Sequence, residues 1–183
     1  MAIFAALAAA LGFLLIHVPN VELLTFTVFA AGVLLGRLKG AVTGALAMAL
    51  YSGANPYGSG AAIPTLFIAQ VCATALAGFV GGAASALWRE GAVGLPLRIV
   101  SSALMGLVLT VIYQVAVVVG ISAMSPDFRT STMAVVASNA FFAVTHIVSN
   151  TVLFAVLGPA VLPRLRRLVP QARGVALPGE REP

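Results

Sequence analysis

The sequence predicts an all-α membrane protein, a bundle of six transmembrane helices. Composition supports this class, because 61% of the 183 residues are hydrophobic and only 8% are charged. Soluble domains carry roughly 25% charged residues, so a chain this apolar is better suited to a lipid bilayer. The apolar residues also fall into six runs that turn-forming stretches separate.

The six apolar runs are interpreted as helices in chain order. A helix needs about 20 residues to cross a hydrocarbon core about 30 Å thick. The predicted segments are residues 2–18, 21–38, 40–52, 64–88, 97–120 and 131–158. The third segment ends early, before "YSGANPYGSG", and is therefore predicted to be short and to span only part of the membrane.

The basic residues predict the orientation of these helices. With a cytoplasmic N-terminus, nine of the ten Lys and Arg residues fall on the cytoplasmic side, and only Arg129 lies outside. The nine are Arg37, Lys39, Arg89, Arg98, Arg164, Arg166, Arg167, Arg173 and Arg181. An excess of bases on one side is the usual signal for the cytoplasmic face, so both termini are predicted to be cytoplasmic.

Two parts of the chain differ in composition. Residues 1–163 form the predicted six-helix transmembrane domain. Residues 164–183, "RLRRLVPQARGVALPGEREP", are basic and rich in Pro and Gly. This composition predicts a cytoplasmic tail that is largely disordered.

Polar side chains gather at one predicted depth, in the outer third of the bundle. Counting 1.5 Å per residue from the outer helix ends places Gln70 and Gln114 at about 9 Å and Asn139 at about 12 Å. Tyr113 lies beside Gln114, and Glu22 falls in the predicted first turn of helix 2, which Asn20 would cap near the water boundary. Polar groups at such depths normally face a protein interior or a wet cavity.

These side chains predict a pocket that opens outward. The loop "NPYGSG" follows the third segment on the outer side, so Asn55 and Tyr57 are further candidate contacts. Gln70 and Asn139 fit ligand contact and structural hydrogen bonding equally well. Glu22 also keeps two interpretations, as a helix cap or as a group that faces an incoming solute.

The last predicted helix carries a polar face. Asn139, His146 and Asn150 are seven and four residues apart and share one side of the helix. His146 and Asn150 fall deeper than Asn139, and an interhelical hydrogen-bond network is the favoured role for these two.

Small residues recur at four-residue spacing on several segments. Ala2, Ala6 and Ala10 lie on the first, and Gly32, Gly36, Gly40 and Gly44 lie on the second and third. Such stripes let helices approach closely in a membrane. Packing inside the bundle explains most of them, whereas the nearly pure alanine stripe of the first helix would also suit a partner protein.

No catalytic pattern is present in the sequence. There is no G-x-S-x-G, H-E-x-x-H, C-x-x-C or P-loop, and no pair of carboxylates at membrane depth. The chain is therefore predicted not to be an enzyme and to hold no metal or cofactor. No charged residue is predicted at the midplane, which argues against an ion-driven carrier with its own energy source.

The pattern resembles the substrate-binding (S) components of energy-coupling factor (ECF) transporters, which take up vitamins in prokaryotes. The resemblance rests on "PNVELLTFTVFAAGVLLGRLKGAVTGALAMALYS" at residues 19–52 and on "NPYGSGAAIP" with "AQV" after it. These strings are similar to the P-N-x-E, G-x-x-x-G and N-P-x-G patterns of that family. The resemblance covers the chain to about residue 165.

Membership would imply an importer built from several subunits in the plasma (inner) membrane of a prokaryote. The family resemblance implies that Ala2, Ala6 and Ala10 dock onto a transmembrane T subunit, which carries two ABC ATPases. It also implies an outward-facing site for a small vitamin-like solute, with no role for nucleic acid. The mostly neutral candidate contacts suit a small polar heterocycle, and Glu22 could pair with an amine. The alternatives are a structural membrane scaffold of the MreD-like shape-determining kind and a stand-alone carrier.

Overall fold

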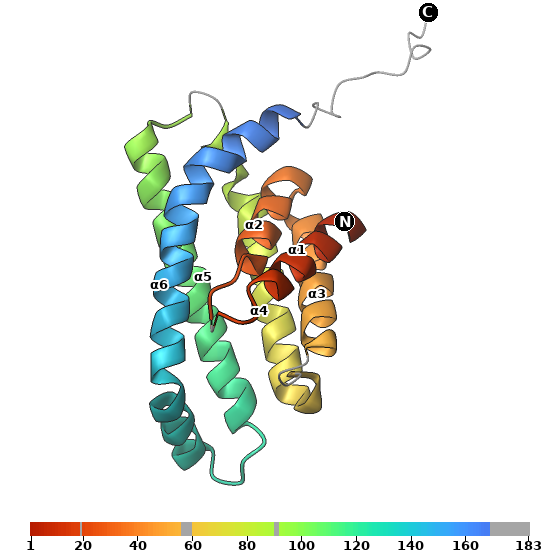
Figure 1. Cartoon of the computed structure of the whole chain (residues 1–183), viewed down its shortest axis with the longest axis vertical. Helices are drawn as coiled ribbons and strands as arrows, with labels where there is room; N and C mark the ends of the chain where they lie inside the picture. The colour runs from red at the N-terminus through yellow and green to blue at the C-terminus, as the bar shows by residue number, and fades with distance from the viewer. Residues whose placement is uncertain (19, 56–59, 90–91, 169–183) are drawn as a thin grey trace, which may run out of the picture.

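The computed structural model describes residues 1–18, 20–55, 60–89 and 92–168. Within these ranges the chain forms six α-helices, as predicted, with two short 3-10 helices and no strand. The α-helices are α1 (Ala2–Leu14), α2 (Leu24–Leu35), α3 (Arg37–Ala54), α4 (Pro64–Ala83), α5 (Leu95–Ser122) and α6 (Phe128–Leu168). The 3-10 helices are η1 (Gly60–Ala62) and η2 (Ala84–Trp88). Figure 1 shows α5 and α6 side by side along one flank of the bundle.

The central helix of the bundle is α2. All its residues from Leu24 to Val33 are buried, and α1, α3, α4 and α6 pack against it. Phe26 and Phe29 both meet the ring of Phe154 on α6 edge-on, with ring centroids 5.2 and 5.3 Å apart. At 1.5 Å per residue its 12 residues extend about 18 Å, so α2 fills only part of the length of the bundle.

Helix lengths depart from the prediction in the first third of the chain. The predicted third helix, 40–52, was expected to be short, but α3 has 18 residues and runs from Arg37 to Ala54, so that prediction is wrong. The short helices are α1 and α2, with 13 and 12 residues. α1 ends at Leu14 and α2 begins only at Leu24. The connection between them includes Asn20, whose left-handed φ of 56° is incompatible with a continuous right-handed helix.

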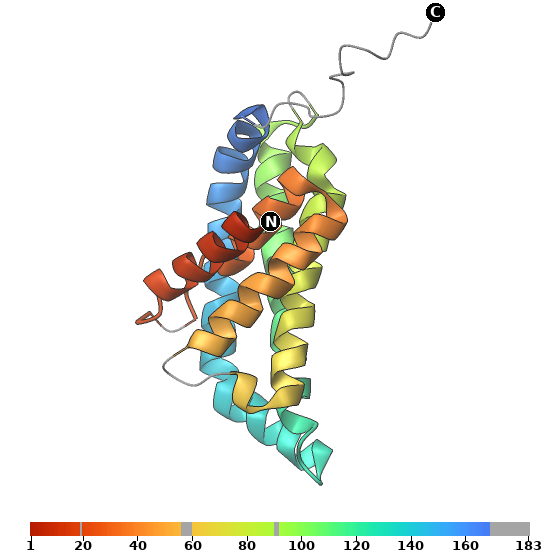
Figure 2. The ribbon, with the colours of Figure 1, turned by 90° about the vertical axis from the view of Figure 1, so that its right-hand side faces the viewer.

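Three helical stretches in the described part of the chain are long and apolar enough to cross a membrane. They are Pro64–Trp88, Leu95–Ser122 and Phe128–Arg167. By contrast α1 and α2 are apolar but extend only about 20 and 18 Å, less than a hydrocarbon core of about 30 Å. Figure 2 shows α1 running obliquely across the bundle. Length and apolarity therefore support a membrane protein anchored by α4, α5 and α6.

Basic residues gather at one end of the molecule. Figure 1 shows the α2–α3 turn, the η2–α5 connection and the C-terminal end of α6 at this same end. Arg37 and Lys39 open α3, Arg89 and Arg98 flank the η2–α5 connection, and residues 164–167 close α6. Arg129 lies at the start of α6, at the opposite end. Seven of the eight bases in the described residues thus lie at one end of the molecule, as predicted, while Arg173 and Arg181 lie outside the described residues.

The last helix is longer than predicted. Asp127 caps its start by accepting the Thr130 N–H at 3.1 Å, and the hydrogen bonds from Thr130 hold the pKa of the Asp127 carboxyl below its usual range. α6 then continues through Pro159 and Pro163 to Leu168, ten residues beyond the predicted end at residue 158. Residues 164–168 of the predicted tail are therefore helical, and the prediction of disorder for 169–183 lies outside the described residues.

Glycines bring the backbones of α2, α3 and α4 into direct contact. A Cβ on Gly32 or on Gly40 would overlap the carbonyl oxygen of Gly78 on α4. One on Gly44 would overlap the carbonyl oxygen of Thr74. These positions belong to the small-residue stripes seen in the sequence, and their role in this chain is packing between its own helices.

The glycine contacts predict a sharp difference between two glycine substitutions. Gly78→Ala should destabilise the protein by about 1–3 kcal/mol, because its new methyl group meets the backbone of Gly40. Gly53→Ala on α3 is the control, since nothing lies within 4 Å of a Cβ there, and it should be neutral or slightly stabilising. Thermal unfolding of the purified proteins in detergent measures both. Equal stability of the two variants would contradict the close backbone contact.

Candidate functional site

A cavity of about 360 Å³ lies where α2 begins. Its walls come from α1, the 15–23 connection, α2, α3, α4, α5 and α6. Its hydrogen-bonding wall residues are Asn20, Glu22, Thr25, Tyr51, Asn55, Gln70, Tyr113, Gln114, Asn139 and His146. A volume of this size is at the lower end of the range for small-molecule sites.

The structure brings together most of the predicted contact residues. Glu22, Asn55, Gln70, Tyr113, Gln114 and Asn139 all line this one cavity. Tyr57, the remaining predicted contact, lies outside the described residues. Counting residues along the helices predicted that these side chains would surround one cavity, and in the structure the six described ones do.

Glu22 is the acid at the centre of the site. Its Oε2 accepts the Thr25 backbone N–H at 2.9 Å, and its Oε1 accepts the Thr25 hydroxyl at 2.5 Å. An acceptor at this place satisfies one of the free N–H groups at the start of α2. The side chain is 17% exposed. The expectation that Glu22 lies almost in water is wrong, because α2 begins inside the bundle and not at its outer end.

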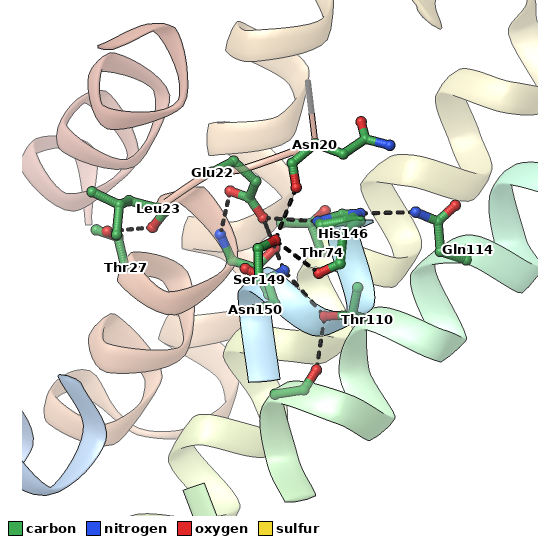
Figure 3. A network of polar contacts seen from close by, with 12 residues as sticks. Asn20, Glu22, Leu23, Thr27, Thr74, Thr110, Gln114, His146, Ser149 and Asn150 are labelled. Atoms are coloured by element: carbon green, nitrogen blue, oxygen red, sulfur yellow. Dashed lines mark hydrogen bonds and ion pairs between the residues drawn. The ribbon is translucent and has the colours of Figure 1, made fainter. Parts of the chain in front are cut away.

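His146 joins Glu22 to Gln114. Gln114 Nε2 lies 2.9 Å from His146 Nδ1, and His146 Nε2 lies 3.4 Å from Glu22 Oε1, as Figure 3 shows. The Gln114 amide, the His146 imidazole and the Glu22 carboxylate thus form one continuous row of polar contacts from α5 to the start of α2.

Asn150 extends the same network one turn further along α6. Its Nδ2 donates to Thr110 Oγ1 at 3.1 Å and to Glu22 Oε1 at 3.4 Å. Asn150 is fully buried. His146 and Asn150 therefore share one carboxylate, and both hold the start of α2 against α6 and α5 (Figure 3).

Asn20 ties the connection before α2 to α6. Its Nδ2 donates to the Phe142 carbonyl at 2.7 Å, and its own carbonyl accepts the Ser149 hydroxyl at 3.0 Å. It was expected to be the N-cap of the second helix, and this is wrong, because the helix starts only at Leu24 and its N-cap is Leu23. A left-handed backbone at Asn20 turns the chain toward α6 instead.

On the other side of the cavity, Gln70 and Tyr113 complete the polar wall. Gln70 Oε1 accepts the Ser52 hydroxyl at 3.2 Å and lies against Gly60 of η1, where a Cβ would overlap it. The Tyr113 ring meets the His146 ring edge-on, with centroids 5.5 Å apart. These contacts link α3 to α4 and α5 to α6 beside the cavity.

Several cavity residues were not singled out from the sequence. Tyr51, Met48, Leu15 and Val117 line the cavity, and His146, assigned to a polar core network, lines it as well. Tyr51 lies in the predicted third helix, 40–52, but no contact was assigned to it; the structure keeps it in α3, which ends at Ala54. The four-residue spacing between Val117 and Tyr113 on α5 is the signal that places both on one face.

The alanine stripe of α1 faces outward. Ala2, Ala6 and Ala10 are exposed, whereas Ala5, Ala8 and Ala9 are buried against the bundle. A helix turns 100° per residue, so positions four apart stay on the same side. The three predicted docking residues therefore form a smooth strip that this chain leaves uncovered.

The arrangement offers many hydrogen-bonding groups to a molecule in the cavity. The described lining contains one acid, one imidazole, two phenols and several amides. Among the described residues no group of three His, Cys, Asp or Glu side chains is placed to hold a metal ion. The site offers many hydrogen bonds from fixed directions around a solute-sized space.

Comparisons with protein-family models, with curated proteins and with solved structures found no match for this chain. The site must therefore be interpreted from its own geometry.

The hydrogen bonds to Glu22 predict a large difference between two neighbouring threonines. Thr25→Val should lower the free energy of unfolding by about 1.5–3 kcal/mol, because the carboxylate loses the hydroxyl at 2.5 Å. Thr27→Val is the matched control: Thr27 is equally buried on α2, but its hydroxyl only shares the Leu23 carbonyl with a backbone N–H. The control should lose about 1 kcal/mol or less. Equal losses in thermal unfolding would contradict a central role for the carboxylate.

Proposed function

We propose that this chain is the membrane-embedded, solute-binding subunit of an ECF-type importer, in the plasma membrane of a prokaryote. One observation carries the proposal: an apolar bundle encloses a cavity of about 360 Å³ whose walls carry hydrogen-bonding side chains from five helices and from the 15–23 connection. Burying this many polar groups in an apolar bundle is costly unless they are paired or serve a ligand. A structural scaffold has no need for such a cavity.

In this proposal the solute binds among Glu22, Asn55, Gln70, Tyr113, Gln114 and Asn139. The subunit has no nucleotide-binding motif, so energy comes from a T subunit and two ABC ATPases. The exposed strip of Ala2, Ala6 and Ala10 supports contact with a membrane partner, because small side chains let a second helix approach α1 closely.

A stand-alone carrier is the second candidate, and the Glu22–His146 pair favours it. An acid and a histidine 3.4 Å apart inside an apolar bundle are the kind of groups that proton-coupled carriers use. The two functions differ in what the purified chain can do alone. If the chain is an importer subunit, vesicles reconstituted with this chain alone should not accumulate the solute under a proton gradient. If it is a stand-alone carrier, they should.

Co-purification tests the proposal directly. The tagged chain, isolated in mild detergent from its own cells, should bring down one further membrane protein and two ATPase chains. Native mass spectrometry of the same sample should also detect a retained solute. Recovery of cell-wall machinery in place of ATPases would support the shape-determining scaffold and contradict the importer.

The docking strip predicts the outcome of a single substitution. Ala6→Trp should abolish co-purification of the partner subunits, because an indole on the exposed side of α1 blocks close helix contact. Retained solute should be unaffected, since Ala6 does not line the cavity. Ala137→Trp, on an exposed position of α6, is the control and should leave the complex intact. If Ala6→Trp still assembles, the docking role of α1 is wrong.

A further inference from the structure

The charge of the cavity determines which solutes it favours. Glu22 brings a carboxylate to the wall, and no Lys or Arg is among the lining residues that the structure describes. The other groups able to carry a charge are His146, Tyr51 and Tyr113. The two phenols are uncharged at neutral pH, so the Glu22 carboxylate is the one acidic group of the described lining.

The donors around Glu22 do not neutralise that charge. Only the two Thr25 bonds are short, at 2.9 and 2.5 Å, while His146 and Asn150 both lie 3.4 Å from Oε1. A carboxylate can accept about four hydrogen bonds, and Oε2 receives one from the described residues. The carboxylate thus keeps room for a donor from the cavity that it lines.

The remaining walls suit a flat ring. Tyr51 and Tyr113 present aromatic rings, and Leu15, Met48 and Val117 supply apolar surface. Aromatic faces attract cations as well as stacking on rings. The amides of Gln70 and Asn139 can bond the edge of a heterocycle from two further directions.

We infer that the cavity binds a small aromatic or heteroaromatic solute that carries a positive charge, with Glu22 as its counter-ion. The inference rests on the proposed function and adds the chemical class of the solute to it. Anionic solutes are disfavoured, because their charge would lie beside a carboxylate in a site that holds no Lys or Arg among the described lining residues. Neutral ring compounds gain the ring contacts but not the ion pair.

Three probes of one shape separate these classes: benzylamine, benzyl alcohol and benzoate. The measurement is the thermal unfolding midpoint of the purified protein over a range of probe concentrations, which gives an apparent affinity for each. Benzylamine should bind about ten-fold more tightly than benzyl alcohol, since a charge-assisted hydrogen bond is roughly twice as strong as a neutral one. Benzoate should bind most weakly.

Glu22→Gln should abolish the preference for the amine, because it removes the negative charge and keeps the shape of the side chain. The amide oxygen can still accept one of the two Thr25 hydrogen bonds. Asp127→Asn is the matched control: this acid lies in the α5–α6 connection, away from the cavity, and its loss should leave the preference intact.

Several outcomes would overturn the inference. In the wild-type protein, the inference is overturned if benzoate binds as tightly as benzylamine. It is also overturned if benzylamine gives no response at any soluble concentration. Both results can be obtained even if the Glu22→Gln protein does not fold. A full amine preference in a folded Glu22→Gln protein would also overturn the inference. None of these outcomes changes which subunits co-purify, so failure of the charge preference is distinguishable from failure of the importer proposal.

Discussion

The architecture of the site depends on one helix start placed inside the bundle. α2 is the most buried helix of the described chain, yet with 12 residues it is too short to fill the bundle from end to end. Its first turn needs an acceptor for the free N–H groups, and the Glu22 carboxylate supplies it through Thr25. The space beyond that turn has no central helix to fill it, and the cavity lies there. The Glu22 carboxylate therefore lies at the boundary between the buried helix α2 and the cavity.

The polar groups around this carboxylate stabilise the fold and shape the site at once. Asn150, Thr110, His146 and Gln114 link α5 and α6 to the start of α2. Each of these four side chains makes at least one hydrogen bond in the network, which rigidifies the core, whereas the buried Asn150 Oδ1 has no partner among the described residues. Since His146 and Gln114 also line the cavity, a solute that bonds them acts on the same contacts that hold α2 in place. A solute bound to these two side chains would therefore also change the stability of the contact between α2 and the helices α5 and α6.

Much of this arrangement could be predicted from the sequence where helices are long and regular. Gln70, Gln114 and Asn139 were placed at similar depths by counting residues along single helices, and all three line one cavity. The same counting failed for Glu22, because it assumed that α2 starts at the outer end. Asn20 has a left-handed φ of 56° there and turns the chain toward α6, which local pattern alone does not reveal. Tyr51 was also missed, although it lies in the predicted helix 40–52, because nothing in the local sequence indicates that its side of the helix faces a cavity.

The glycine contacts among α2, α3 and α4 lie outside the cavity lining and are of a different kind from the contacts around the cavity. Where Gly32 and Gly40 meet Gly78, main chain touches main chain, so these helices cannot shift apart or together without losing the contact. The cavity is lined instead by residues such as Leu15, Val117 and Asn139, whose side chains can be exchanged for larger or smaller ones. Substitutions there can therefore change the volume of the cavity while the backbone contacts of the glycines keep the three helices in place.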